Sequence, residues 1–141
     1  AVNGTVHKLP LAANARASLR LIAAFARQVP EGGGAIVALT SDHTTGNLPY
    51  GASKGALDRI VISAARELGP RGISANVVNP GPIDTGWMDA ETRDALAGHH
   101  PLGRFGTPRD IAGITAFLLS DAGRWVSGQL LHTDGGFSAR F

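Results

Sequence analysis

The chain has 141 residues, of which 43% are hydrophobic and 17% are charged, and its formal net charge is +2 at pH 7. These values are typical of a soluble globular protein and exclude an intrinsically disordered chain. Lys and Arg form no dense run, which argues against a nucleic-acid partner, and no segment reads as a membrane span or a signal peptide. The sequence has no cysteine, so it excludes disulfides and thiolate metal sites, and the expected location is the reducing cytoplasm.

The first predicted element is a helix. Apolar residues recur with helical spacing from Asn14 to Val29, and Pro30 with the glycines that follow it ends the pattern. Residues 35–39 (AIVAL) form a short, continuous apolar run, which predicts a strand buried on both faces, as in a parallel sheet. A polar loop follows from Ser41 to Asn47.

A second helix is predicted from Pro49 to Leu68, because proline is favoured in the first turn of a helix. We expect one apolar face along it, at Ala52, Ala56, Ile60, Ala64 and Leu68. The next predicted strand covers residues 73–78 and is closed by the turn Asn79-Pro80-Gly81-Pro82. From Ile83 to about Gly106 the sequence is polar and predicts irregular structure.

The last third of the sequence predicts one further helix and one further strand. Thr107 is suited to cap the helix and Pro108 to begin it. The buried stripe is expected at Ile111, Ile114, Thr115 and Leu118. Residues 129–133 predict a short strand. Because helices and strands alternate without hairpin signals, the prediction is the α/β class, with a single domain over residues 1–141 built on a parallel sheet.

Tyr50 and Lys54 are four residues apart at the start of the second helix, so both side chains can lie on the same face. A phenol holds its proton too tightly to serve as a base at neutral pH, and a nearby cation lowers its pKa. The pair therefore suits general acid/base chemistry. The alternative is a tyrosine that packs its ring while the lysine stem covers apolar surface.

The position of this pair in the predicted sheet favours the chemical interpretation. Ser41 follows one strand directly, and the turn after Asn79 follows the next. Ligands bind at the carboxyl edge of open parallel sheets, where these segments meet.

Six stretches taken together resemble the short-chain dehydrogenase/reductase family, and are similar to 3-oxoacyl-acyl-carrier-protein reductases. They cover about residues 14–137, in the family's order: NARAS, GGAIVALTS, YGASKGAL, ISANVVNPGPIDT, PLGRFGTPRDIAGITAFLLSD and VSGQLLHTDGGF. The resemblance implies a Rossmann-like fold and an NAD(P)-dependent oxidoreductase that acts on a carbonyl or a secondary alcohol.

The resemblance also implies four catalytic residues. Tyr50 matches the tyrosine that exchanges a proton with the substrate oxygen, and Lys54 matches the lysine that lowers its pKa and binds the nicotinamide ribose. Ser41 matches the serine that hydrogen-bonds the substrate oxygen. Asn14 matches the asparagine that holds a water beside the lysine, although an asparagine at a helix start is also a common capping residue.

The loop that follows Asn79 resembles the family segment that holds the nicotinamide carboxamide. The matching residues are Pro80, Gly81, Ile83 and Thr85. The simpler interpretation of this loop is a tight turn that leaves a strand. The turn Asp134-Gly135-Gly136 matches one near the subunit interface in the family and is interpreted as structural.

Three histidines and two apolar residues need separate interpretations. His43, His99 and His100 have no ligand spacing to a third partner, so they are interpreted as solvated loop residues and no metal site is predicted. Trp87 and Met88 fall where the resemblance places a substrate lid, and they either line an apolar pocket or pack the lid down.

Two departures from the family pattern matter. Only eight residues separate Ser41 from Tyr50, which is shorter than usual, so the substrate wall is expected to differ in shape. The glycine-rich turn that receives the pyrophosphate is absent, as is the residue that selects NAD or NADP. We therefore expect a C-terminal part of a longer chain, which lacks the N-terminal nucleotide-binding half.

Two functions follow from this interpretation. The first is the NAD(P)-dependent oxidoreductase with a small-molecule substrate. The second is a non-catalytic fragment or relative that serves as an assembly subunit, because family members form dimers or tetramers through the helices matching residues 14–29 and 49–68 and through the last strand. Either way the resemblance implies a homo-oligomer.

Overall fold

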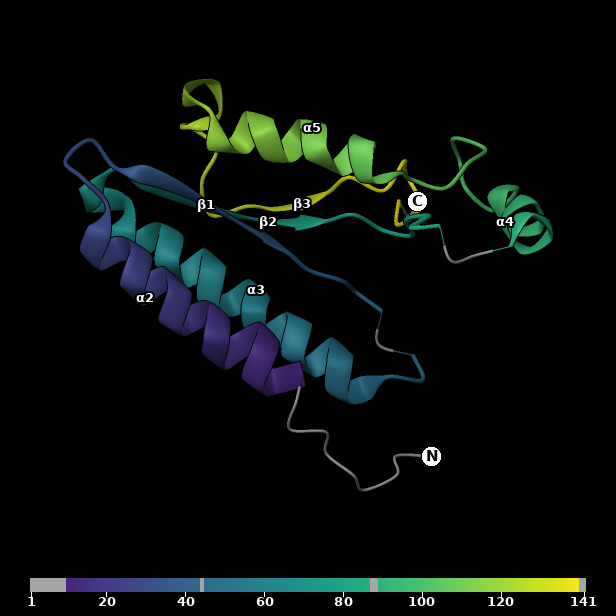
Figure 1. Ribbon diagram of the computed structural model, residues 1–141, viewed down its shortest axis with the longest axis horizontal. Coiled ribbons are helices and arrows are strands. Elements are labelled where there is room, and N and C mark those ends of the chain that lie inside the picture. The colour runs from purple at the N-terminus through teal and green to yellow at the C-terminus, as the bar shows by residue number, and fades with distance from the viewer. Residues whose placement is uncertain (1–9, 44, 87–88, 140–141) are drawn as a thin grey trace.

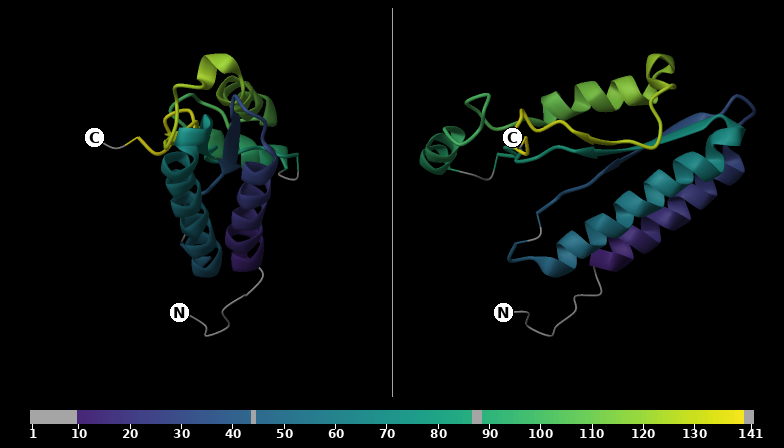
Figure 2. Two further views of the ribbon diagram at one scale, coloured as in Figure 1. Left: turned by 90° about the vertical axis from the view of Figure 1, so that its left-hand side faces the viewer. Right: turned by 180° about the vertical axis from the view of Figure 1, so that it is seen from behind.

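The computed structural model describes residues 10–43, 45–86 and 89–139. In these ranges three strands form one sheet in the order β1-β2-β3, and each neighbouring pair is parallel. Helices cover both faces of the sheet, with α2 and α3 side by side on one face and α5 on the other (Figures 1 and 2). The α/β class with a Rossmann-like parallel sheet is thus confirmed.

The three strands differ in how deeply they lie. The central strand β2 (Ile73–Asn79) is buried at every position, whereas β1 (Gly34–Leu39) is half-buried and β3 (Leu130–His132) is largely exposed. Within the described residues β1 pairs only with β2, with Ile36 opposite Ala75. As predicted, β1 packs on both faces, with Ile36 and Ala38 against the α3-side cluster and Val37 against the α5-side cluster, but its residues stay half-buried because its outer edge has no partner strand among the described residues.

The first helix begins earlier than predicted. A π-helical segment, η1 (Leu11–Ala17), runs directly into α2 (Ser18–Gln28), so Asn14 lies inside the helix rather than at its start. Ile22 packs against the core, and Ala26 is buried. Val29 leaves the helix in an extended conformation, and the chain then turns into β1.

The core-facing side of helix α3 (Leu48–Leu68) agrees only in part with the predicted face. The buried positions are Gly51, Ser53, Leu57, Val61 and Ala64, while Ala52 is exposed. Of the predicted face, Ala64 is buried in the core and Leu68 packs against it, whereas Ile60 borders the groove to α2. Apolar residues on α3 face both the sheet and α2. The spacing alone therefore did not indicate which of these positions would be buried against the sheet. The helix ends in the short η2 (Gly69–Arg71), after which Gly72 has a positive φ of 71°.

The segment predicted as irregular contains a helix, α4 (Ala90–Ala97). It lies beyond the carboxyl end of β2, at one end of the molecule (Figure 1). The segment has no periodic apolar pattern, and the described positions of α4 are exposed or half-buried, so no apolar face indicated a helix.

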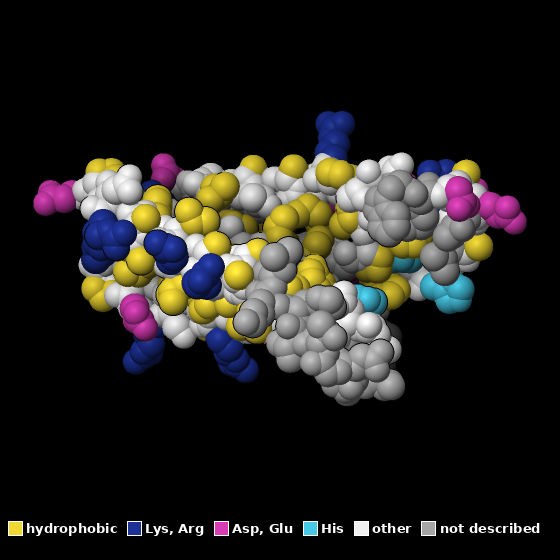
Figure 3. Space-filling view, turned by 60° about the horizontal axis from the view of Figure 1, so that its bottom comes forward, with side chains coloured by type: hydrophobic (Ala, Val, Ile, Leu, Met, Phe, Trp, Pro, Cys, Tyr) yellow, Lys and Arg dark blue, Asp and Glu magenta, His cyan; other side chains and the backbone are white. Residues whose placement is uncertain are grey.

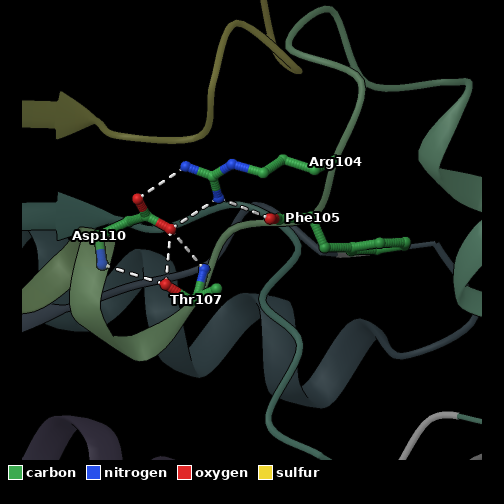
Figure 4. Close-up of polar contacts among 4 residues, drawn as sticks. All are labelled: Arg104, Phe105, Thr107 and Asp110. Carbon is green, nitrogen blue, oxygen red and sulfur yellow. Dashed lines mark hydrogen bonds and ion pairs between the residues drawn. The ribbon is translucent and has the colours of Figure 1, made fainter.

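Helix α5 (Pro108–Leu119) starts as predicted. Thr107 caps it, with the Asp110 amide donating to Thr107 Oγ1 at 3.4 Å and the Asp110 carboxylate accepting from Thr107. Arg104 donates two hydrogen bonds to Asp110, at 2.8 and 2.9 Å (Figure 4). The bonds from Arg104, and then from Thr107, hold the pKa of the Asp110 carboxyl well below its ordinary value. Ile111 and Leu118 are buried, and Ile114 packs on them.

The sheet separates two apolar clusters. Leu57, Val61, Ala64, Ala75 and Val77 pack together on the α3 side. Val78, Ile111 and Leu118 pack on the α5 side. After α5 the short η3 (Asp121–Gly123) leads to β3. No helix in the described ranges is long and apolar enough to cross a membrane.

A buried amide joins β2 to the segment that enters β3. Asn76 is fully buried, its Nδ2 donates to the Val126 carbonyl at 2.6 Å, and its Oδ1 accepts from the Gln129 amide at 3.1 Å. Ser127 accepts from the Ala75 amide at 3.2 Å. These bonds fix where β3 joins the sheet, because every polar atom of the Asn76 amide group has a backbone partner on that segment.

We predict that Asn76→Ala lowers the free energy of unfolding by about 2 kcal/mol, because the Val126 carbonyl and the Gln129 amide lose the part-buried hydrogen bonds that the buried Asn76 side chain makes with them. Chemical denaturation measures the change. The matched control is Asn47→Ala, since Asn47 is exposed and its side chain makes no capping bond; it should stay within about 0.5 kcal/mol of the parent protein. Equal effects of the two substitutions would contradict the role given to Asn76.

Candidate active site

The predicted site residues gather at the carboxyl edge of the sheet. Ser41 follows β1, the loop from Pro80 to Thr85 follows β2, and α3 begins at the end of the molecule toward which the strands point (Figure 1). Since parallel strands end at one edge, segments far apart in sequence meet there. The Asn14 amide reaches the same end through its helix η1, which packs on α3.

Tyr50 and Lys54 lie together on the first turns of α3. Lys54 Nζ is 5.7 Å from the centroid of the Tyr50 ring, within the range of a cation–π contact. The same ammonium group donates to the Leu39 carbonyl at 2.8 Å. Lys54 therefore connects α3 to the last residue of β1 and holds its charge beside the phenol ring.

Two influences act on the charge of Lys54. Burial lowers the pKa of its ammonium group below the ordinary value, and the carboxylate of Asp58, one turn further along α3, partly offsets this. A lowered pKa means that the folded protein disfavours the extra proton at this position.

Asn14 makes its contact with α3 through a serine that the sequence interpretation missed. The Asn14 amide donates to Ser53 Oγ at 3.0 Å, and Ser53 Oγ donates to the Tyr50 carbonyl at 2.7 Å. Ser53 is fully buried and immediately precedes Lys54. A small hydroxyl residue on the apolar side of a predicted helix was the available signal, because a buried hydroxyl needs a partner.

Ser41 lies at this edge but bonds locally. Its Oγ accepts from the His43 amide at 3.2 Å. In the part of the chain that the structure describes, no hydrogen bond joins Ser41 to Tyr50. Thr40, the preceding residue, is buried, and its hydroxyl has no hydrogen-bond partner there.

The loop after β2 is tightly held. The Gly81 amide donates to Asn79 Oδ1 at 3.1 Å, and Gly81 has a φ of +63°. A Cβ at Gly81 would lie 2.4 Å from the Asp134 Cβ, so only glycine fits between this loop and the later turn. Thr85 is exposed at the end of the loop.

Ile83 forms an isolated parallel bridge with Gly106. The bonds of this bridge run from the Asp84 amide to the Gly106 carbonyl at 2.9 Å and from the Gly106 amide to the Pro82 carbonyl at 3.2 Å. In a parallel bridge of this kind the central residue's own N–H and C=O point away from the partner strand. Ile83 thus presents one donor and one acceptor on the open side, the pair that a carboxamide needs.

The turn Asp134-Gly135-Gly136 is organised by the buried Asp134 carboxylate. It accepts from the amides of Gly136 and Ser138, each at 2.9 Å. Burial alone would raise the pKa of Asp134, but these hydrogen bonds outweigh it and the pKa is lowered.

One histidine prediction is wrong. His100 is only 6% exposed and lies between two aromatic rings, with centroids 4.4 Å from Phe105 and 4.8 Å from Phe137. One of these rings, Phe137, is distant in sequence, so the loop composition around His100 misled the prediction. His43 and His99 are exposed, as expected. Within residues 10–43, 45–86 and 89–139, no three His, Asp or Glu side chains gather as a metal site would require. Trp87 and Met88 lie outside the described residues.

Comparison with known proteins gives a consistent picture. A family model described as enoyl-(acyl carrier protein) reductase matches residues 7–138. The uncharacterized oxidoreductase YjdA of Bacillus subtilis is 43% identical over 133 residues, which are 89% of this chain and 53% of YjdA.

Two solved structures resemble the whole described fold. A blue fluorescent protein from a metagenomic library, in complex with NADPH, is 43% identical with a TM-score of 0.78, over 89% of this chain and 53% of that one. The angucycline C-6 ketoreductase LanV with bound NADP is 34% identical with a TM-score of 0.78, over 90% of this chain and 52% of that one. The chain therefore spans about half the length of the relatives it matches.

We predict that Asn14 and Ser53 are energetically coupled. Asn14→Ala and Ser53→Ala should each destabilise the protein, and the double variant should lose about 1 kcal/mol less than the sum, because both single changes break the same bond. Denaturant unfolding of the four proteins gives the coupling. Ser63→Ala, an exposed position on α3, is the control and should combine additively with Asn14→Ala. Additive effects of Asn14 and Ser53 would refute the coupling.

Proposed function

The chain belongs to the short-chain dehydrogenase/reductase family, and on that premise we propose that the protein is an NAD(P)-dependent oxidoreductase. The reaction transfers a hydride between nicotinamide and a small-molecule carbonyl or secondary alcohol. The observation that carries this proposal is the Tyr50–Lys54 pair at the carboxyl edge of the sheet, with Lys54 bonded to the end of β1.

In the reducing direction Tyr50 acts as the general acid. Its phenol O–H breaks as the proton passes to the substrate oxygen, while the substrate carbon gains the hydride, so the carbonyl becomes an alcohol. In the oxidising direction the same oxygen takes the proton back. The Lys54 cation, 5.7 Å from the ring centroid, stabilises the phenolate left after proton transfer. Ser41 hydrogen-bonds the substrate oxygen and Asn14 supports the relay through α3.

The bound cofactor supplies or accepts the hydride at C4 of its nicotinamide. The donors on this chain fit such a group: Lys54 and Tyr50 would bind the ribose, and the loop of Pro80, Gly81, Ile83 and Thr85 would hold the carboxamide. The outward N–H and C=O of Ile83 favour this role. The NADPH and NADP bound by the two similar structures support NAD or NADP as the cofactor.

We further propose that the protein works as a homo-oligomer, a dimer or tetramer, in the cytoplasm. Leu19 and Leu21 on α2 are 53% and 70% exposed, and a groove of about 380 Å³ runs between α2 and α3. Figure 3 shows apolar side chains gathered between basic ones on the face where these helices lie. The same surface supports the second candidate, a non-catalytic assembly subunit, since association needs no cofactor.

Tyr50→Phe should lower kcat by about 10²–10⁴-fold, because the proton donor is lost while the ring remains. The dissociation constant of the cofactor should rise by no more than about tenfold, since one hydroxyl bond to the ribose is worth about 0.5–1.5 kcal/mol. Steady-state kinetics and fluorescence titration measure the two quantities. Ser63→Ala on the same helix is the control for substitution in α3. Full turnover by Tyr50→Phe would refute the role of Tyr50.

Cofactor binding separates the two candidates. If the protein is the oxidoreductase, NADH or NADPH at 100 times its Kd should stabilise the folded state by about 2.7 kcal/mol, measured as a rise in Tm. AMP at the same concentration is a control for binding that does not involve nicotinamide. Self-association in sedimentation experiments with no Tm change for either cofactor would favour the assembly subunit.

A further inference from the structure

Three buried side-chain polar atoms have no hydrogen-bond partner among the described residues, and they belong to Thr40, Asp58 and Ser74. Buried polar groups are normally paired, and an unpaired one costs free energy, so each of the three needs an explanation. Two of them lie near Lys54. Thr40 directly follows Leu39, whose carbonyl accepts from Lys54, and Asp58 is one helical turn from Lys54 on α3.

Thr40 is held at the end of β1. Its amide donates to the Val78 carbonyl at 2.9 Å, so its backbone continues the pairing with β2. Side chains alternate along a strand, and Ile36 and Ala38 pack in the α3-side cluster, so the same alternation places Thr40 on that face. This is the layer from which Lys54 reaches the sheet. Thr40 is only 4% exposed, so its hydroxyl is shielded from solvent.

The Lys54 ammonium group lies within reach of the Thr40 side chain. It donates to the Leu39 carbonyl at 2.8 Å, and covalent geometry keeps Thr40 Oγ1 within about 5 Å of that same oxygen. An ammonium group has three N–H donors, and Lys54 makes only this one hydrogen bond in the part of the chain that the structure describes. Rotation about χ1 of Thr40 can exchange its hydroxyl with its methyl group. The hydroxyl can therefore turn toward the ammonium group with little change in packing.

Two titratable neighbours act on this ammonium group. The Asp58 carboxylate partly offsets the lowering of the Lys54 pKa by burial, although the two groups form no ion pair. The Tyr50 ring centroid is 5.7 Å from Lys54 Nζ. A neutral acceptor in contact with the ammonium group would favour its charged form without adding a charge to the site.

We propose that Thr40 is a positioning residue for Lys54, and that its hydroxyl accepts a second hydrogen bond from the ammonium group while that group stays on the Leu39 carbonyl. Two acceptors fix the ammonium group in place and keep it protonated beside Tyr50. The effect on turnover rests on the proposed function, in which Lys54 stabilises the Tyr50 phenolate. Because the Thr40 side chain is buried, it acts through Lys54 and not on the substrate.

The first test measures Lys54 directly and needs no catalytic activity. The sequence has two lysines, Lys8 and Lys54, so Lys8→Arg leaves one lysine signal in NMR of protein labelled with ¹³C at the lysine ε-carbon. In that background Thr40→Val removes the hydroxyl and keeps the shape of the side chain. The affinity of Lys54 for its proton should fall about tenfold, because the charged form loses an acceptor. Thr40→Ser keeps the hydroxyl and should restore it.

Ser74→Ala is the matched control. Ser74 is 5% exposed and its hydroxyl is also unpaired, but it lies near the amino end of β2, at the opposite end of the sheet. Its loss should leave the titration of Lys54 unchanged. Thermal unfolding checks that both variants fold, with Tm within about 5 °C of the parent protein. Thr40→Ala replaces Thr40→Val if that variant does not fold.

Turnover gives the second test. In Thr40→Val, kcat for carbonyl reduction should fall about fivefold with KM within about twofold, since Thr40 does not contact the substrate. The pH above which reduction declines should also move down. The reason is that Lys54 loses its proton at a lower pH and then no longer stabilises the phenolate. Thr40→Ser should restore both kcat and the pH profile.

An unchanged proton affinity of Lys54 in Thr40→Val would overturn the proposal, as would an equal change in Ser74→Ala. A lower proton affinity with unchanged kcat and pH profile would overturn the role in turnover. If the parent protein binds no cofactor and reduces no carbonyl substrate, the proposed function fails, and the titration of Lys54 alone then decides whether Thr40 holds the ammonium group.

Discussion

The parallel direction of the three strands is the constraint on which the site depends. Each helical crossover returns the chain to the end of the sheet at which the strands begin. The strands therefore run in one direction, and β1 and β2 both end at the same edge. Ser41 and the loop from Pro80 to Thr85 are brought to that edge by strand direction alone. Lys54 then joins the two layers there, because its ammonium group bonds the last carbonyl of β1 from a helix on the face of the sheet.

Helix α3 serves the core and the site with the same turns. Leu57 and Val61 fix its position on the sheet, while Tyr50 and Lys54 occupy the end that reaches the edge. Ser53 lies between these two regions and uses its hydroxyl to join Asn14 to the backbone of Tyr50. Core packing therefore fixes the position of the helix that carries the candidate proton donor. A substitution at Leu57 that shifts α3 would also shift Tyr50.

The sequence was sufficient to predict the features that depend on the spacing and type of neighbouring residues. The strands around Ile36 and Ala75, the cap at Thr107 and the pairing of Tyr50 with Lys54 follow from spacing and composition. Features decided by distant neighbours were missed. The core side of α3 depends on which of its apolar positions meet the sheet, and the described positions of α4 are exposed or half-buried. His100 stacks on Phe137, which lies far along the chain. The roles of Asn14, Ser41 and the Pro80–Thr85 loop rest on the resemblance and remain predictions.

The bonds of Asn76 have a consequence for the order in which the protein folds. Its two partners, Val126 and Gln129, follow it by 50 and 53 residues. Contacts of such long range form slowly, because a large loop must close before they are made. During synthesis β2 and β1 can pair long before β3 leaves the ribosome, and until then the Asn76 amide must remain hydrated. Until β3 joins, that side of β2 has no strand partner, and an open strand edge is a template for pairing with another chain.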